Sequence, residues 1–240
     1  MSPAVLGLET SGTWCSVALA TRGRVHARRL AVGNAHSDHV LDLVAEVLAE
    51  TGMPLSGCDA IAFGAGPGSF TGLRIACAVA QGLAFGAGLP VVAVGTLDAI
   101  AFGAASESAT ATLLVAQDAR MGEVYWGVFD VLADVPRPLT APSLSKAGVT
   151  GHALAEAGFA LPFAVGAGNA WQAHPDALAG VAARIVVREA ADAADVAVLG
   201  AREFAAGRAI DAADAVPLYV RDRVAETTVE RAARRALAAA

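Results

Sequence analysis

Residues 59–94 read DAIAFGAGPGSFTGLRIACAVAQGLAFGAGLPVVAV and decide the fold class. Within them, residues 59–63 are expected to form a buried strand, residues 64–68 a glycine-rich turn, residues 70–87 a helix and residues 91–94 a second strand. Strands that alternate with helices in this way favour parallel pairing through crossover connections. The stretch therefore predicts an α/β fold.

Three short segments precede this stretch, at residues 5–10, 14–20 and 25–32. They are rich in apolar and β-branched residues and are separated by Ser-Gly and Arg-Gly dipeptides. Turn dipeptides between such segments are typical of antiparallel hairpins. We therefore expect the chain to open with three antiparallel strands.

The second half repeats this opening. A strand expected over residues 112–118 ends in Asp118, as the first strand ends in Glu9, and residues 122–131 are expected to return beside it. Further strands are expected at residues 163–168 and 185–189, a helix at 195–206 and an extended arm at 216–220. The repeat predicts duplicated lobes, each a ββ-hairpin plus βα units, with the acid-ended turns facing the cleft between them.

The boundary between the lobes is expected near Gly103, where a small polar stretch suits a crossing. We expect a first lobe over residues 1–105, a second over residues 106–223 and a terminal helix over residues 224–240.

The helix expected over residues 37–51, with Asn34 or Ser37 as its cap, has an unusually broad apolar side. Its apolar stripe is roughly 160° wide at 100° per residue, and consists of Val40, Leu41, Leu43, Val44, Val47 and Leu48. In the following helix, Gly82 and Gly86 would let another helix approach closely. Both features fit a helix–helix interface, and ordinary packing within the chain explains them as well.

Composition and charge limit the function classes. The 240 residues carry a formal net charge of -6, which disfavours strong direct nucleic-acid binding by this chain alone. The cysteines, Cys15, Cys58 and Cys77, lack metal-binding spacing and are expected to be reduced thiols. The first residues show no basic or hydrophobic signal segment, so a cytoplasmic location is expected.

Residues 75–95 contain Gln81 as their one polar side chain and are long enough to cross a bilayer. Pro90 and several glycines divide the segment. A buried helix, a turn and a buried strand explain it better, and no membrane contact is expected.

The glycine-rich turn is the first candidate for an anion or nucleotide site. It joins a strand to the N-terminus of a helix, where free N–H groups bind phosphate, and its candidate contacts are Gly66, Gly68, Ser69, Thr71 and Arg74. It matches neither the phosphate-binding loop with Gly-Lys-Ser/Thr nor the dinucleotide fingerprint. A tight turn with close helix–sheet packing is an equal alternative.

Glu9 and Asp118 extend this candidate site, together with Ser11. A carboxylate at the end of a first strand could hold a magnesium-bound phosphate, although acids that cap turns explain both positions equally. His36, His39 and Asp42 make a metal site conceivable, but residues at a helix start more often act as caps. No cofactor, metal or catalytic motif is expected.

Four segments resemble the TsaB family, also called YeaZ. They are Leu6-Gly7-Leu8-Glu9-Thr10-Ser11, His36-Ser37, Gly66-Pro67-Gly68-Ser69-Phe70-Thr71-Gly72-Leu73-Arg74, and Asp118-Ala119-Arg120 through Glu123-Val124-Tyr125. The resemblance covers residues 5–130, with a weaker match at residues 217–221. It implies the two-lobed fold of actin, sugar kinases and chaperone ATPases (the ASKHA fold).

The resemblance also implies a function. Proteins of this family are non-catalytic subunits of the machinery that attaches N6-threonylcarbamoyl to adenosine 37 of transfer RNA, and they pair with the catalytic TsaD and the ATPase TsaE. The metal motif His-Leu-Glu-Gly-His of TsaD reads Thr96-Leu97-Asp98-Ala99-Ile100 here, so both imidazoles are replaced. The resemblance therefore implies no catalysis and no metal.

The family's partner contact lies on helices of the first lobe, and without TsaD the same surface is expected to form a homodimer. The residues that we assign to it are His36, Val40, Leu41, Val44, Leu48, Arg74, Gly82 and Gly86. Gly166-Ala167-Gly168-Asn169 lies where related ATPases hold adenosine, but weak or absent nucleotide binding is expected. The alternatives are a stand-alone ATP-dependent phosphotransferase or peptidase-like enzyme, and an interaction protein outside RNA modification.

Overall fold

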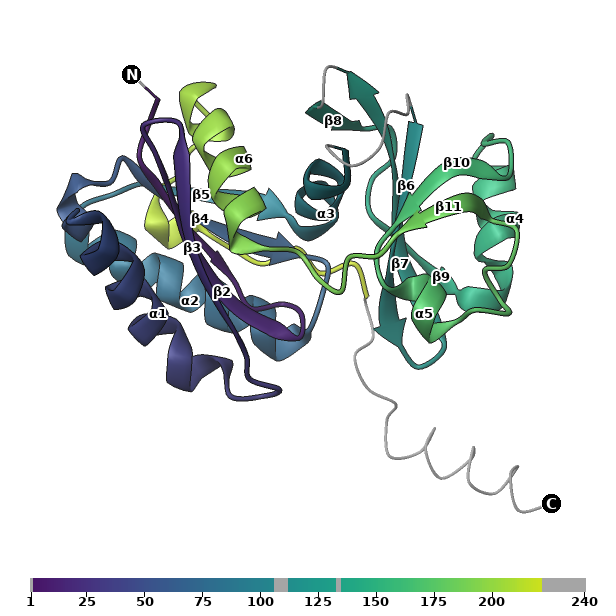
Figure 1. Ribbon diagram of the computed structural model, residues 1–240, viewed down its shortest axis with the longest axis horizontal. Helices are drawn as coiled ribbons and strands as arrows, with labels where there is room; N and C mark the ends of the chain where they lie inside the picture. Colours follow the sequence, from purple (N-terminus) through teal and green to yellow (C-terminus); the bar gives the residue numbers. More distant parts are fainter. Residues whose placement is uncertain (1, 106–111, 133–134, 222–240) are drawn as a thin grey trace, which may run out of the picture.

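The computed structural model describes residues 2–105, 112–132 and 135–221. The chain forms two α/β lobes that lie side by side, each with a mixed sheet at its centre (Figure 1). The predicted two-lobed α/β architecture is thus what the structure shows.

The sheet of the first lobe has the strand order β3-β2-β1-β4-β5. Its strands are β1 (Val5–Glu9), β2 (Trp14–Thr21), β3 (Arg24–Ala31), β4 (Ala60–Gly66) and β5 (Val91–Gly95). β1, β2 and β3 pair antiparallel, whereas β4 pairs parallel with both β1 and β5. The antiparallel opening and the parallel βαβ unit predicted from the sequence are both confirmed.

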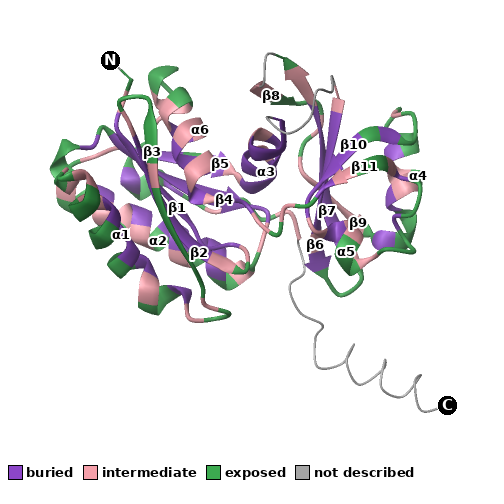
Figure 2. Cartoon of the chain, in the orientation of Figure 1, coloured by how far each residue is buried: buried purple, intermediate pink, exposed green. Residues whose placement is uncertain are grey.

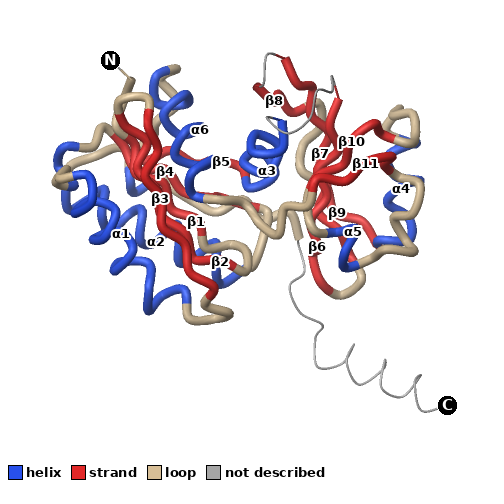
Figure 3. The backbone as a smooth tube through the Cα atoms, in the orientation of Figure 1, coloured by secondary structure: helices blue, strands red, loops and turns tan. Residues whose placement is uncertain are grey.

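Helices cover both faces of this sheet. α1 (His36–Thr51) and α2 (Phe70–Ala87) lie on one face, and α6 (Ala193–Ala205) lies on the other (Figure 3). Ser69 caps α2 by accepting from Gly72 N–H, and Gly88 ends it in a left-handed conformation. The cap predicted for α1 is wrong, because Ala35 occupies that position and the Ser37 hydroxyl donates to Asp38.

The second lobe repeats the topology of the first. Its order β11-β10-β6-β7-β8 matches β5-β4-β1-β2-β3 strand for strand, with β9 also paired to β7. The strands are β6 (Thr112–Arg120), β7 (Glu123–Leu132), β8 (Val135–Pro138), β9 (Ser143–Lys146), β10 (Phe163–Ala167) and β11 (Ala182–Val186). Short helices accompany them, namely α4 (Thr150–Glu156) and α5 (Ala170–Ala173), with a 3-10 turn at Ala147–Val149. Two further 3-10 turns, at Leu55–Gly57 and Ala212–Asp214, belong to the first lobe.

α3 (Thr96–Ala105) joins the two lobes, and the sequence did not reveal it as a helix. It lies between the lobes and is buried along most of its length (Figure 2). Leu97, Ile100 and Ala104 share one apolar cluster with residues of both sheets, including Val94 of β5 and Leu113 of β6. A helix that is buried on all sides lacks an amphipathic period, which explains why the pattern was not recognised.

α6 corrects the domain assignment. The sequence placed residues 195–206 in the second lobe, but α6 packs across β1 and β4 of the first. A Cβ at Gly7 would lie 2.7 Å from the Ala193 oxygen, so β1 and α6 approach closely at this point. The lobe boundary near Gly103 stays a prediction, since residues 106–111 are not described, and residues 224–240 lie outside the described chain.

α2 is the one helix in the described ranges whose length and apolar composition would suffice to cross a bilayer. These two criteria are weak evidence, because core helices of folded proteins meet them too. Ala76, Ala80 and Ala84 of α2 are buried against the first sheet, and the Gln81 side chain donates to the Ala215 oxygen.

The contact of β1 with α6 leads to a first prediction. Gly7→Val should lower the free energy of unfolding by roughly 1–3 kcal/mol, because a whole isopropyl group must enter a filled space. Gly148→Val is the control, since no other described atom lies within 4 Å of a Cβ built there. Denaturant unfolding measures both, and equal stability losses would contradict the assigned packing of α6.

Candidate functional site

A cleft of about 660 Å³ lies between the lobes. Its walls come from the β1–β2 turn, the start of α2, the end of β6 and the arm over residues 218–221. Among the residues predicted to bind an anion or nucleotide, it brings together Ser11, Gly68, Ser69, Thr71 and Asp118.

The glycine-rich turn packs tightly on the β1–β2 turn. A Cβ at Gly68 would lie 2.7 Å from the Ser11 Cβ, and one at Gly72 would collide with the Thr10 carbonyl. The Thr10 hydroxyl donates to the Gly72 oxygen over 2.7 Å, and Gly72 N–H is taken by Ser69. Close packing therefore accounts for these glycines, which supports the structural alternative.

Gly66 lies under the arm. Its φ of +124° favours glycine, and a Cβ there would lie 2.5 Å from the Leu218 oxygen. Leu218 N–H donates to the Ala65 oxygen over 2.7 Å, which holds the arm on β4.

Arg74 also contacts the arm. Its guanidinium lies 3.7 Å from the centre of the Phe70 ring and donates to the Tyr219 hydroxyl over 3.0 Å. A guanidinium stacked on an aromatic ring is stabilised by a cation–π interaction. The arm and the first turn of α2 therefore hold Arg74 away from the position expected of an anion ligand.

Glu9 lies inside the core, with none of its surface exposed. One carboxyl oxygen accepts from Ser11 N–H, and the other has no described partner and lies against Gly64, where a Cβ would overlap it. Burial raises the pKa of this carboxyl to about 7, against the lowering effect of the Ser11 hydrogen bonds. Glu9 thus does not face the cleft as predicted.

Asp118 does face the cleft, and neighbours hold it. One carboxyl oxygen accepts from Arg120 N–H over 2.9 Å and lies 2.9 Å from His174 Nε2. Its own N–H donates to the Asn169 side-chain oxygen over 2.8 Å. The turn-capping alternative is therefore realised, and His174 is a neighbour that the sequence gave no reason to expect.

Two buried polar atoms on the cleft residues have no hydrogen-bond partner within the described chain. They are Gln117 Oε1 and Arg221 Nε. Buried polar atoms are normally satisfied, so these could serve a polar ligand or water. The sequence did not single out Gln117 or Arg221 as site residues. Gln117 lies inside a strand and Arg221 ends the arm, and neither belongs to a motif with a recognisable spacing.

The predicted adenosine segment packs within its own lobe. A Cβ at Gly166 would lie 2.5 Å from the Trp171 ring, and one at Gly168 would collide with the Ala116 oxygen. Asn169 donates to the Glu189 oxygen over 3.1 Å while it accepts from Asp118 N–H. The side chain of Trp171 thus occupies the space beside Gly166.

The residues predicted for the partner surface divide into two groups. His36, Val40 and Val44 are buried inside the first lobe, and His36 Nε2 lies 3.1 Å from the Gly12 oxygen. Leu48 is half-buried, whereas Leu41 is 55% exposed. The buried group cannot contact a partner from this position, which corrects its assignment.

The second helix of this surface is more open than the sequence indicated. No described atom outside α2 lies within 4 Å of a Cβ built at Gly82 or Gly86. Phe85, between them, is 86% exposed. The sequence did not single out Phe85, because it stands in an apolar segment that suggested burial throughout.

The described residues contain no cluster of three side chains suited to a metal ion. His36 is buried in the lobe, His39 is half-buried and Asp42 is exposed. At the positions of the imidazoles in TsaD, Thr96 is fully buried and donates its hydroxyl to the Pro67 oxygen, and Ile100 is part of the core.

Comparison with known proteins gives a consistent set of relatives. Residues 30–228 match the family model described as TsaD, tRNA N6-adenosine threonylcarbamoyltransferase. The chain is 34% identical over 226 residues to the tRNA threonylcarbamoyladenosine biosynthesis protein TsaB of Escherichia coli K12, covering 92% of this chain and 96% of that protein. It is 46% identical over 123 residues to the Haemophilus influenzae protein of the same name, covering 51% and 52%.

Solved structures agree with these relatives. YeaZ from Pseudomonas aeruginosa is 33% identical with a TM-score of 0.77, covering 90% of this chain and 99% of that one. A second structure, described as an uncharacterized protein from the same organism with similarity to peptidase YEAZ, is 33% identical with a TM-score of 0.81, covering 91% and 100%. The predicted two-lobed actin-like fold is confirmed.

The buried carboxyl of Glu9 leads to a second prediction. Its pKa of about 7 lies above the unfolded value of 4.5, so its penalty is absent at low pH and complete above pH 7. Relative to Glu9→Gln, the wild type should lose roughly 2–3 kcal/mol of unfolding free energy between pH 5 and pH 8.

Unfolding by denaturant across this pH range measures the difference. Glu156→Gln is the control, because that side chain is 69% exposed on α4. If wild type and Glu9→Gln show the same pH dependence, Glu9 is not the buried titrating group.

Proposed function

The chain belongs to the TsaB family, also called YeaZ, of tRNA threonylcarbamoyladenosine biosynthesis proteins, and we propose that it is the non-catalytic scaffold subunit of that machinery. In this role it binds and activates TsaD, the subunit that transfers the threonylcarbamoyl group to adenosine 37 of transfer RNA. TsaE, an ATPase, completes the complex. Because its proposed complex acts on transfer RNA, the location proposed with it is the cytoplasm.

The observation that carries this proposal is the apolar surface on α1 and α2, defined here by Leu41, Gly82, Phe85 and Gly86. A phenylalanine that is 86% exposed beside two open glycines is a costly arrangement for an isolated protein. Aromatic side chains of this kind are favoured anchors of protein interfaces. Open glycines on a helix let a second helix approach closely.

Residues in the first lobe support a scaffold rather than a catalyst. Thr96 and Ile100 stand in the core where a metal-binding pair of imidazoles would be needed, and neither side chain suits a transition metal there. Glu9 is enclosed and bonded to Ser11, so it offers no carboxylate to a magnesium-bound phosphate. The proposed contribution of this chain is therefore contact with TsaD.

The charge distribution supports protein rather than RNA contact. The net charge is -6, and two arginines of the edge strand β3 are paired with acids. Arg28 lies 2.6 Å from Glu50, and Arg29 lies 3.4 Å from Asp192. We therefore propose no strong direct binding of nucleic acid.

A second candidate function is ligand binding in the cleft between the lobes, as in a stand-alone phosphotransferase. The unpartnered atoms of Gln117 and Arg221 favour a polar ligand there. Asp118 faces this cleft, but its carboxyl accepts from Arg120 N–H and lies beside His174, so we expect weak or no ATP binding. Calorimetry with ATP and magnesium, followed by a turnover assay on the isolated chain, separates this candidate from the scaffold.

The apolar surface leads to a third prediction. Phe85→Glu and Leu41→Glu should each reduce co-purification with TsaD at least tenfold, because a buried unpaired charge opposes the interface. Val149→Glu is the matched control, since Val149 is 51% exposed on the second lobe. Thermal unfolding of all three variants should stay close to that of the wild type.

Homodimerisation is tested with the same variants. If α1 and α2 also form the two-fold contact of the isolated chain, Phe85→Glu should shift the protein toward monomer in analytical ultracentrifugation. If both Phe85→Glu and Leu41→Glu pair normally with TsaD, the interface with TsaD lies elsewhere on the chain.

A fourth prediction concerns the modified nucleoside in cells. Depletion of the chain should lower threonylcarbamoyladenosine in total transfer RNA, and wild type or Val149→Glu should restore it. Phe85→Glu should restore little of it. Full restoration by Phe85→Glu would separate the pathway role from this surface.

A further inference from the structure

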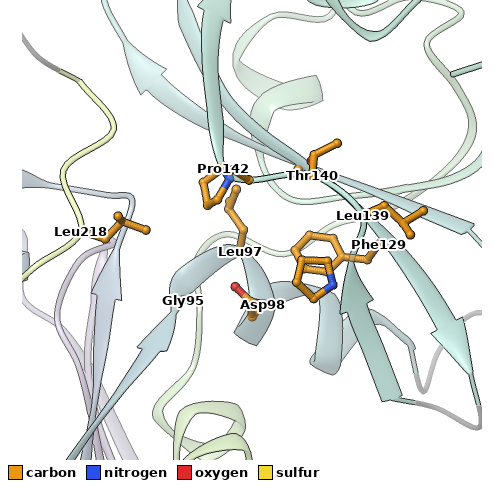
Figure 4. A pocket seen from close by; sticks show the side chains of 11 residues that line it. Gly95, Leu97, Asp98, Phe129, Leu139, Thr140, Pro142 and Leu218 are labelled. Atoms are coloured by element: carbon orange, nitrogen blue, oxygen red, sulfur yellow. The ribbon is translucent and has the colours of Figure 1, made fainter. Parts of the chain in front are cut away.

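A second cavity, of about 460 Å³, lies where α3 meets the second lobe and the arm. Leu97 and Asp98 of α3 lie on one side of it, with Phe129, Leu139 and Pro142 across from them and Leu218 at the edge (Figure 4). The volume falls in the range of pockets that hold small molecules. The cavity is separate from the carboxylates of Glu9 and Asp118.

Asp98 is the one ionisable side chain among the described residues that line this cavity. Its carboxylate makes no hydrogen bond or ion pair with the side chain of any other described residue. Burial, with a smaller contribution from the negative charge of Glu203, raises the pKa of Asp98 to about 6. At neutral pH the cavity therefore contains a carboxylate that is mostly ionised, and none of the described residues that line it supplies a counter-charge.

Gly95 leaves room for this carboxylate. A Cβ at Gly95 would collide with an oxygen of Asp98, so a larger residue there would displace the side chain. Asp98 lies in the first turn of α3, where the helix dipole favours a negative charge. The helix dipole explains why the negative charge of Asp98 is tolerated. It does not explain the cavity that lies beside the carboxylate.

We propose that this cavity binds a small primary amine with an apolar body. The ammonium group would pair with Asp98, and a charge-assisted hydrogen bond in a largely apolar site is stronger than one in water. The apolar body would lie against Leu139, Pro142 and Leu218. Leu139 is 52% exposed and Leu218 43% exposed, so both offer accessible apolar area to a ligand.

The same cavity discriminates against two related classes of ligand. An amino acid carries a carboxylate, and none of the described lining residues has a cationic side chain to pair with it. A neutral alcohol lacks the charge that Asp98 requires. The proposed specificity is thus for monoamines over amino acids and alcohols of the same shape.

Three matched probes test this specificity on the purified full chain. They are isoamylamine, isoamyl alcohol, which removes the charge, and leucine, which adds a carboxylate. Isoamylamine should bind at one site with a Kd on the order of 1 mM, as its small size allows. The alcohol and leucine should bind at least tenfold more weakly in calorimetry.

Variants test the role of the carboxylate. Asp98→Asn should weaken isoamylamine binding at least tenfold, whereas Asp176→Asn, an exposed position with the same charge change, should leave it unaltered. Ala141→Phe, which enlarges an exposed lining residue, should also reduce binding if Asp98→Asn fails to fold. The proposal is overturned if isoamylamine does not saturate the wild type, binds Asp98→Asn equally, or binds no better than leucine.

Discussion

The packing of α3 between the two sheets is the constraint on which the rest of the structure depends. Leu97, Ile100 and Ala104 share one apolar cluster with residues of both lobes, in addition to the separate core that each lobe has. Each buried aliphatic side chain of this kind contributes about 1.5–3 kcal/mol through removal from water. The lobes are therefore held in one relative position, and both cavities form at the margins of this contact.

The two lobes differ in the environment of the acidic residue near the end of their first strand. Glu9 and Asp118 stand at equivalent places in equivalent sheets, yet one is fully buried and the other lies in the cleft. Gly64 makes the space that encloses Glu9, whereas Asn169 and His174 position Asp118. Two carboxylates that could have shared a bound cation thus have different environments. The fold is retained without the symmetric site that its topology would permit.

The sequence predicted the elements whose signal is local. The βαβ unit of residues 59–94 and the opening hairpins have clear turns and periods, and α2 was predicted over the range that the structure shows. α3 was missed because its burial on all sides removes the helical period. The lobe to which α6 belongs could not be predicted, because its contact with Gly7 joins residues far apart in the chain. Site residues were missed for the same reason, since His174 reaches Asp118, and Arg221 reaches the cleft, through tertiary contacts alone.

The exposure of Phe85 and the burial of Val44 could not be predicted from the apolar composition of their helices. Both residues belong to helices with broad apolar sides, and the side that packs on the sheet can be identified only when the sheet is placed. Once α1 and α2 lie on the first sheet, their alanines and valines fill the core and Phe85 is left outside. A large aromatic side chain on a face with open glycines reduces the solubility of an isolated chain. Its presence is most simply explained if a partner covers this face, which is the contact proposed with TsaD.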